Sequence, residues 1–175
     1  GLDSVEIGIG DNLLAAPWIR TLVRINKSFI VQRGLPVREM PKAFQELSGY
    51  IRHAITKKQT GVWIAQREGR AKDSNDRTQE SILKMFALSG TKSFIENLKE
   101  LNICPATISY EYDPCDYLKA KEFQQKRDNA NFKKSPQDDL LNMKTGIMGD
   151  KGHVHFTFTP SINSELEQIE VSIDN

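Results

Sequence analysis

The sequence is poor in cysteine, with only Cys104 and Cys115 among 175 residues. So few thiols do not form the framework of a disulfide-rich secreted domain, and we expect both to be reduced in a cytosolic compartment. The sequence also lacks any run of about 18 apolar residues, so we expect no membrane-spanning helix. No signal peptide is recognisable either. These absences favour a globular domain in the cytoplasm.

The sequence also lacks an excess of either positive or negative charge. The chain has 24 Lys and Arg against 23 Asp and Glu, for a formal net charge of +1. This balance gives no electrostatic reason to expect nucleic-acid binding. Hydrophobic residues make up 38% of the sequence and the mean hydropathy is −0.49. That composition is typical of a soluble protein long enough for one domain with a sizeable core.

Two kinds of apolar patterning alternate along the chain. Strand-like segments occur at residues 4–9, 29–31, 60–66, 103–110 and 153–159. Helical spacing of apolar residues occurs at 13–25, 41–58, 82–88, 91–101, 117–127 and 140–147. Thr91 is the expected cap of its helix. The alternation predicts one α/β domain over residues 1–175, with a mostly parallel central sheet flanked by helices.

The most distinctive stretch is the strand around Trp63 and the charged turn that follows it. The turn reads Arg67-Glu68-Gly69-Arg70, with Lys72 close behind. Glycine permits a tight turn or a close approach to a ligand, and arginine presents planar donors suited to phosphate or carboxylate. Ligands of open α/β sheets bind beyond the carboxyl ends of the strands, where this turn is expected. The alternative, left open by charge alone, is a solvated loop whose charges pair with one another.

A second strand repeats this theme. Phe29-Ile30-Val31 is followed by Gln32-Arg33-Gly34, so another apolar strand delivers an arginine and a glycine at its end. Because the two strands share this pattern, we predict that their ends are spatial neighbours. If they are side by side, Arg33 and the turn at 67–70 line one basic pocket.

The three histidines give weaker indications of a functional site than the charged turn does. His53 lies off the apolar stripe of its helix, which favours a solvent-facing position. His153 and His155 are two residues apart on one face of a strand whose other face, Val154, Phe156 and Phe158, is expected to point into the core. That spacing can chelate a metal, but no third ligand is indicated nearby, so we expect an exposed strand face and no metal or other cofactor.

Three short blocks in order resemble the glycerolipid acyltransferases, the family of glycerol-3-phosphate and 1-acylglycerol-3-phosphate acyltransferases, and a bacterial branch of it. Phe29 to Arg33 is similar to the family's second block, with one more residue before the arginine than its commonest form. Glu68-Gly69 matches part of the third block, Phe-Pro-Glu-Gly-Thr-Arg, although Gln66-Arg67 replaces Phe-Pro and Arg70 stands in the threonine position. Residues 103–108 are similar to the fourth, proline-led strand.

The resemblance implies an O-acyltransferase of phospholipid synthesis. The acyl donor would be acyl-CoA or acyl carrier protein, and the acceptor a glycerol phosphate or lysolipid hydroxyl. The implied acceptor-binding residues are Arg33, Glu68, Gly69 and Arg70, with Arg67 and Lys72 in second rank. The family location is cytoplasmic and peripheral, on the inner face of the membrane.

One departure from the family pattern concerns the catalytic block, His-x-x-x-x-Asp, which does not occur in this sequence. In the family it precedes the second block, so we expect it upstream of Gly1. The chain is then the C-terminal major part of a larger domain truncated at both ends. A different class of function also fits the basic turn: a non-catalytic module that binds phosphate or other anions. A hydrolase is disfavoured, because no Gly-x-Ser-x-Gly occurs.

Overall fold

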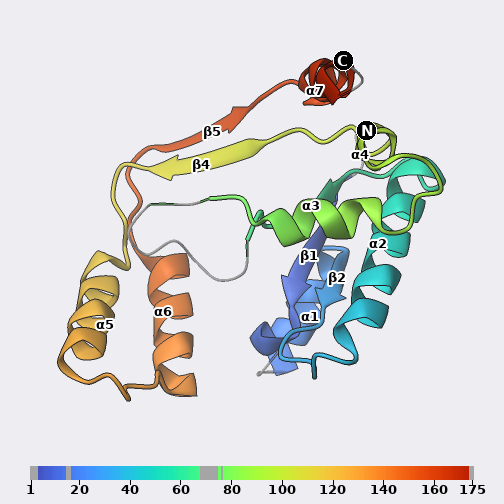
Figure 1. The fold of residues 1–175 in the computed structure, drawn as a ribbon. Helices are drawn as coiled ribbons and strands as arrows, with labels where there is room; N and C mark the ends of the chain where they lie inside the picture. Colours follow the sequence, from blue (N-terminus) through green and yellow to red (C-terminus); the bar gives the residue numbers. More distant parts are fainter. Residues whose placement is uncertain (1–3, 15–16, 68–74, 76, 174–175) are drawn as a thin grey trace. The chain divides into compact units, whose positions relative to one another are not determined.

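A computed structural model describes residues 4–14, 17–67, 75 and 77–173 of the chain (Figure 1). The described residues form seven α-helices, a three-stranded parallel sheet and a two-stranded antiparallel sheet. The chain divides into two compact units, where sequence patterning predicted one domain over residues 1–175. Unit 1 comprises residues 1–103 and 161–175, and unit 2 comprises residues 104–160. None of the described helices is both long and apolar enough to cross a membrane.

The parallel sheet lies in unit 1 and has the order β2-β1-β3, with β1 (Glu6–Gly10) in the centre. β2 (Ser28–Val31) and β3 (Val62–Trp63) both run parallel to it. A short 3-10 helix η1 (Asp11–Leu13) and α1 (Pro17–Ile25) connect β1 to β2, and α2 (Met40–Thr56) connects β2 to β3. The two crossovers run in opposite directions along the sheet. Such connections are right-handed in almost all known sheets, which predicts that α1 and α2 cover opposite faces.

The core of unit 1 lies between α2, α3 (Glu80–Ala87), α4 (Phe94–Lys99) and α7 (Asn163–Ile173). Its fully buried anchors are Ile51 of α2 and Leu98 of α4. Other members of the apolar stripe of α2, namely Phe44, Leu47 and Ile55, pack against this core, which confirms the helical spacing noted in the sequence. Sequence patterning missed α7, because its segment is rich in acidic and polar residues.

The start of α4 differs from the sequence prediction. Ser93, rather than Thr91, is its N-cap: the Ser93 hydroxyl accepts from the Glu96 N–H, and the Glu96 carboxylate accepts from the Ser93 N–H. This reciprocal capping box satisfies two donors at the helix end, whereas a lone threonine satisfies one. The helix consequently begins two residues later than a cap at Thr91 requires.

In the central strand, Gly8 has a steric role. A Cβ built on Gly8 would lie 2.9 Å from Cζ of Phe29 and 3.4 Å from Cγ1 of Ile64. The ring of Phe29 therefore covers the backbone of β1 and, on its other side, packs at a tilt on Tyr50 of α2 with the ring centroids 5.1 Å apart. The close approach of the Phe29 ring to Gly8 thus packs β2 against β1, and its contact with Tyr50 packs the sheet against α2.

Unit 2 contains the second sheet and a helical hairpin. β4 (Ala106–Tyr110) pairs antiparallel with β5 (Val154–Phe158), with Ile108 opposite Phe156. Between them lie α5 (Asp116–Asp128) and α6 (Pro136–Met148). Among the described residues, both strands therefore pair outside the parallel sheet, which corrects the expectation that one mostly parallel sheet gathers the strands. The buried carboxylate of Glu122 in α5 forms ion pairs with the ammonium groups of Lys126 and Lys134.

The expected core face of β5 is a second correction. Val154, Phe156 and Phe158 are exposed by 42%, 53% and 64%. They share one face with Ile108 and Tyr110 of β4, as the register requires, and those two side chains are exposed as well. Alternation along a strand specifies which side chains share a face but not what covers that face, so the inference from alternation to burial was wrong.

Candidate functional site

Three parallel strands of unit 1 end at the same edge of the sheet, which is where ligands of such sheets bind. β1 ends at Gly10 and is followed by Asp11, and β2 ends at Val31, opposite Gly10 in the register. The two ends are joined by a hydrogen bond from the Arg33 N–H to Oδ2 of Asp11, at 3.3 Å. The backbone of the predicted acceptor-binding arginine is thus fixed by the carboxylate that directly follows the central strand.

Gly34 completes this strand end. Its φ of +67° lies in the left-handed region, and an added Cβ would meet no atom within 4 Å. Glycine is therefore favoured here by backbone conformation and not by lack of space. The turn at Gly34 leads the chain away immediately after Arg33, whose side chain is half-buried at the sheet edge.

The end of β3 is tied to a later segment. The N–H of Gln79 donates to the carbonyl of Gln66 at 2.9 Å, and the hydroxyl of Thr78 donates to Oε1 of Gln66 at 2.8 Å. Nη1 of Arg67 donates to the carbonyl of Asn75 at 3.3 Å. Glu68, Gly69, Arg70 and Lys72 lie outside the described residues. The described residues on either side of that stretch are therefore hydrogen-bonded to one another.

The structure tests one part of the predicted pocket, the arrangement of the strands that lead to it. β1 lies between the strands that precede Arg33 and Arg67, so these two strands are not neighbours in the sheet. All three strands run the same way, and their carboxyl ends lie at one edge of the sheet. That Arg33 and the turn at 68–70 line a single surface stays a prediction. The residue that sequence reasoning missed is Asp11, although an acidic residue directly after a strand-like segment is a readable signal.

Of the three histidines, His53 lies in unit 1, and His153 and His155 lie in unit 2. His53 lies in the last turn of α2 and is exposed, as its position off the apolar stripe predicted, and its carbonyl accepts from the N–H groups of Lys57 and Lys58. In unit 2 the His153 side chain is 99% exposed, with Nε2 3.9 Å from a carboxylate oxygen of Glu111. Within the described part of the chain, no group of three or more His, Cys, Asp or Glu residues is placed to hold a metal.

At the opposite, amino-terminal edge of the sheet, a buried carboxylate is bound by a lysine and a tyrosine. Glu6 of β1 accepts hydrogen bonds from the Lys58 ammonium and the Tyr50 hydroxyl. The Lys58 hydrogen bond, followed by that of Tyr50, lowers the pKa of Glu6, while the bond to Glu6 and burial raise the pKa of Tyr50. The Lys58 ammonium also lies 5.6 Å from the centroid of the Tyr50 ring. The cluster connects β1 to α2 and lies away from the edge that carries Arg33.

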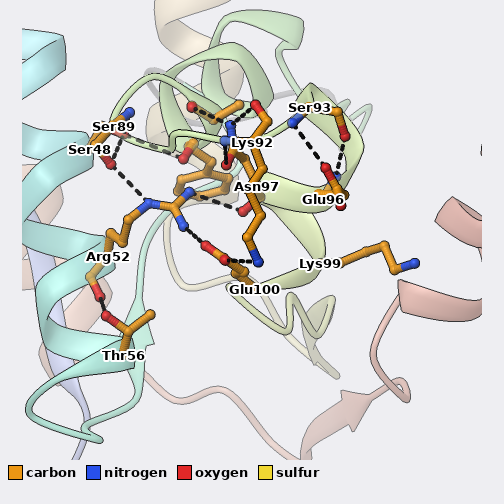
Figure 2. A network of polar contacts seen from close by, with 12 residues as sticks. Ser48, Arg52, Thr56, Ser89, Lys92, Ser93, Glu96, Asn97, Lys99 and Glu100 are labelled. Carbon is orange, nitrogen blue, oxygen red and sulfur yellow. Dashed lines mark hydrogen bonds and ion pairs between the residues drawn. The ribbon is translucent and has the colours of Figure 1, made fainter.

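A second polar cluster connects α2 to the α3–α4 turn (Figure 2). The Arg52 guanidinium donates to the Ser89 hydroxyl at 3.2 Å, to the Asn97 carbonyl at 3.1 Å and to the Glu100 carboxylate. Lys92 pairs with the same carboxylate at 2.7 Å; this hydrogen bond lowers the pKa of Glu100 and raises that of Lys92. The two cations share the Glu100 carboxylate, and the other guanidinium donors bond the Ser89 hydroxyl and the Asn97 carbonyl, so the cluster is a hydrogen-bonded network that links α2 to the α3–α4 turn.

Comparisons of the chain with protein-family models, curated proteins and solved structures found no match in any of the three.

Proposed function

We propose that this chain supplies the acceptor-binding part of an O-acyltransferase of glycerolipid synthesis. The observation that carries the proposal is the shared sheet edge. The strands that lead to Arg33 and to Arg67 flank one central strand in parallel, and the Arg33 backbone is held there by Asp11. These two strands also carry the sequence blocks that resemble the family, in the family's order. The proposed finer fold is accordingly glycerolipid acyltransferase-like.

In the proposed reaction, a histidine oriented by an aspartate removes the proton from the acceptor hydroxyl. The hydroxyl oxygen then attacks the thioester carbonyl of acyl-CoA or acyl carrier protein, an ester forms, and the thiol leaves. Arg33 and Arg70 hold the acceptor phosphate, and Glu68 orients the cations. Positioning of this kind accounts for a large part of such rate enhancements. The proposed location is cytoplasmic and peripheral, at the inner face of a membrane.

The first test measures acceptor binding, because it needs no catalytic pair. Titration of the chain with glycerol 3-phosphate, followed by NMR shifts, should show binding that glycerol does not reproduce. A hydrogen bond to a charged group contributes about 1.5–3 kcal/mol, so Arg33→Ala should weaken binding by one to two decades. Arg127→Ala is the matched control, because Arg127 is exposed on α5 and pairs with the neighbouring Asp128.

The outcomes separate the two candidate functions. If inorganic phosphate binds as tightly as glycerol 3-phosphate, the glycerol moiety is not recognised and the anion-binding module is favoured. If neither ligand binds, or if Arg33→Ala leaves affinity unchanged, the proposed site is wrong.

The second test measures turnover by the 175-residue chain itself. Because the sequence contains no His-x-x-x-x-Asp, we expect no thiol release from acyl-CoA or acyl carrier protein with any of these acceptors. Release that disappears on substitution of His53, His153 or His155 would show that the base had been misplaced.

A further inference from the structure

The ribbon formed by β4 and β5 has one apolar face and one polar face. Residues paired across two antiparallel strands lie on the same side of the sheet. One side therefore carries Ala106, Ile108, Tyr110, Val154, Phe156 and Phe158, here called the ribbon face. The other side carries Thr107, Ser109, His155 and Thr157. The five larger side chains of the ribbon face are exposed by 39% to 64%, and apolar exposure grouped in this way is typical of an interaction surface.

Unit 2 buries little apolar material elsewhere. The structure describes all of residues 104–160, and the buried residues among them are Cys115, Glu122 and Asn142. Figure 1 shows the α5–α6 hairpin at one end of the ribbon and not over it. A two-stranded ribbon without a packed face is at best marginally stable in water. We therefore expect the ribbon face to be covered by another surface.

The absence of charge on the ribbon face limits what that surface can be. None of its six members is a charged residue. A partner with charged groups at its centre would lose their hydration there without gaining an opposite charge. A second copy of the chain brings no charge to the centre of the contact, so it meets neither this cost nor like-charge repulsion.

The sizes of the side chains also favour a second copy. The large corner residues Tyr110 and Phe158 lie on one diagonal of the ribbon face, and the smaller Ala106 and Val154 lie on the other, because Ala106 pairs with Phe158 and Tyr110 with Val154. A two-fold axis between two facing ribbons, along or across the strands, exchanges the two diagonals. Each large corner of one copy then faces a small corner of the other, which is the arrangement that fills space in packed layers.

We propose that the ribbon face is the surface through which two copies of this chain form a symmetric dimer. The contact is isologous, with the same face used by both copies, and it is a two-sheet sandwich with the ribbons about 10 Å apart. Ile108 and Phe156 lie at its centre. This inference goes beyond the proposed function and does not depend on acyl transfer.

The area of the ribbon face indicates the strength of the dimer. An aromatic side chain can bury about 150–250 Å², and Tyr110, Phe156 and Phe158 are each exposed by about half or more. These three therefore offer about 300 Å² per copy, to which the two aliphatic side chains add less. Stable complexes bury about 800 Å² per partner. The dimer should accordingly be reversible, with monomer and dimer both present at micromolar to near-millimolar concentration.

The test is sedimentation velocity of the 175-residue chain over that range. We expect a concentration-dependent shift from monomer to dimer. Phe156→Asp should raise the dissociation constant about a hundredfold or more, because both copies lose a buried aromatic ring. Thr157→Asp is the matched control: it places the same charge one residue along β5, on the polar side of the ribbon, and should leave the dissociation constant unchanged.

A second variant tests the packing and does not introduce a charge. Ala106→Phe places a large side chain at a small corner, so it should weaken the dimer about tenfold or more by overpacking in both copies. Thr107→Phe, the neighbouring position on the polar side, should not weaken it. Circular dichroism of each variant shows whether its secondary structure is retained, and Ala106→Phe keeps the proposal testable if Phe156→Asp does not fold.

Several outcomes would overturn the proposal. It is wrong if the chain stays monomeric over the whole range, if Phe156→Asp and Thr157→Asp behave alike, or if Ala106→Phe associates as well as the unsubstituted chain. Species larger than a dimer would also contradict it, because an isologous contact closes with two copies. If Leu22→Asp, at an exposed leucine of α1, dissociates the dimer instead, the copies meet through unit 1. Arg33→Ala should leave association unchanged, so failure of the acceptor site and failure of this interface are distinguishable.

Discussion

Substitution of Tyr50 by phenylalanine tests whether the Glu6 cluster stabilises unit 1. In Tyr50→Phe the ring remains available to pack on Phe29, and the hydroxyl that donates to the Glu6 carboxylate is lost. Glu6 is 6% exposed, so water does not replace the missing donor freely. A hydrogen bond to a charged group contributes about 1.5–3 kcal/mol, and we expect the free energy of unfolding to fall by that amount near neutral pH.

The pH dependence gives this prediction its sign. Because the folded-state pKa of Glu6 lies below its ordinary value of 4.5, its contribution is complete above 4.5 and is lost as the pH falls through the lower folded value. The pKa of Tyr50 is raised from 10.0, so its contribution is complete below 10.0 and is lost only as the pH rises through the higher folded value. The difference between wild type and Tyr50→Phe should therefore shrink on acidification below 4.5.

The measurement is urea unfolding followed by circular dichroism, at neutral and acidic pH, for wild type, Tyr50→Phe, Glu6→Gln and the double variant. Tyr117→Phe, at an exposed tyrosine of α5, is the control and should change stability little. Additive effects of the two substitutions in the double-mutant cycle would refute the direct coupling of Tyr50 and Glu6. A stability difference that stays constant below pH 4.5 would refute the assignment of the bond to the ionised carboxylate.

Three further predictions concern other sites. Gly34→Ala should destabilise unit 1 by about 1 kcal/mol through its left-handed backbone alone, measured by urea unfolding, and a neutral effect would mean that φ relaxes. Asn97→Ala should cost about 1–3 kcal/mol in the same assay, because the buried amide bonds the Ala87 carbonyl and both backbone groups of Lys92. In a complete enzyme, Arg70→Ala should weaken acceptor binding by one to two decades, more than Lys72→Ala does, because a guanidinium can bind two phosphate oxygens; steady-state kinetics with acceptor and donor varied separately would show a larger Lys72 effect if the ranking were reversed.

Sequence patterning located the elements of unit 1 well because each has a strong local signal. The apolar spacing through Phe44, Leu47, Ile51 and Ile55 can only be satisfied by a helix, and α2 spans Met40–Thr56. The strands around Ile9, Phe29 and Trp63 alternate with helices, and the chirality of crossovers then makes parallel pairing the expected arrangement. The central position of β1 was not predictable, because no local pattern specifies which strand a crossover returns beside.

Unit 2 shows the limit of the same reasoning. β4 and β5 each have strand character, but the partner of Ile108 is Phe156, 48 positions away with two helices between. Nothing in either segment distinguishes antiparallel pairing with the other from addition to the parallel sheet. The apolar residues at 154, 156 and 158 were therefore assigned to a core, where the structure has them on an exposed face.

In the candidate site, some residues have a local signal in the sequence and one is brought there only by strand pairing. Arg33 and Gly34 were recognisable because a strand, an arginine and a glycine follow one another in the sequence. Asp11 acts on Arg33 from 22 positions away, and only the neighbouring positions of β1 and β2 bring the two together. A carboxylate that accepts from the Arg33 backbone fixes the chain there without using an arginine side-chain donor in that bond. The central strand thereby sets where the arginine emerges from the sheet, and residue order alone could not have shown this.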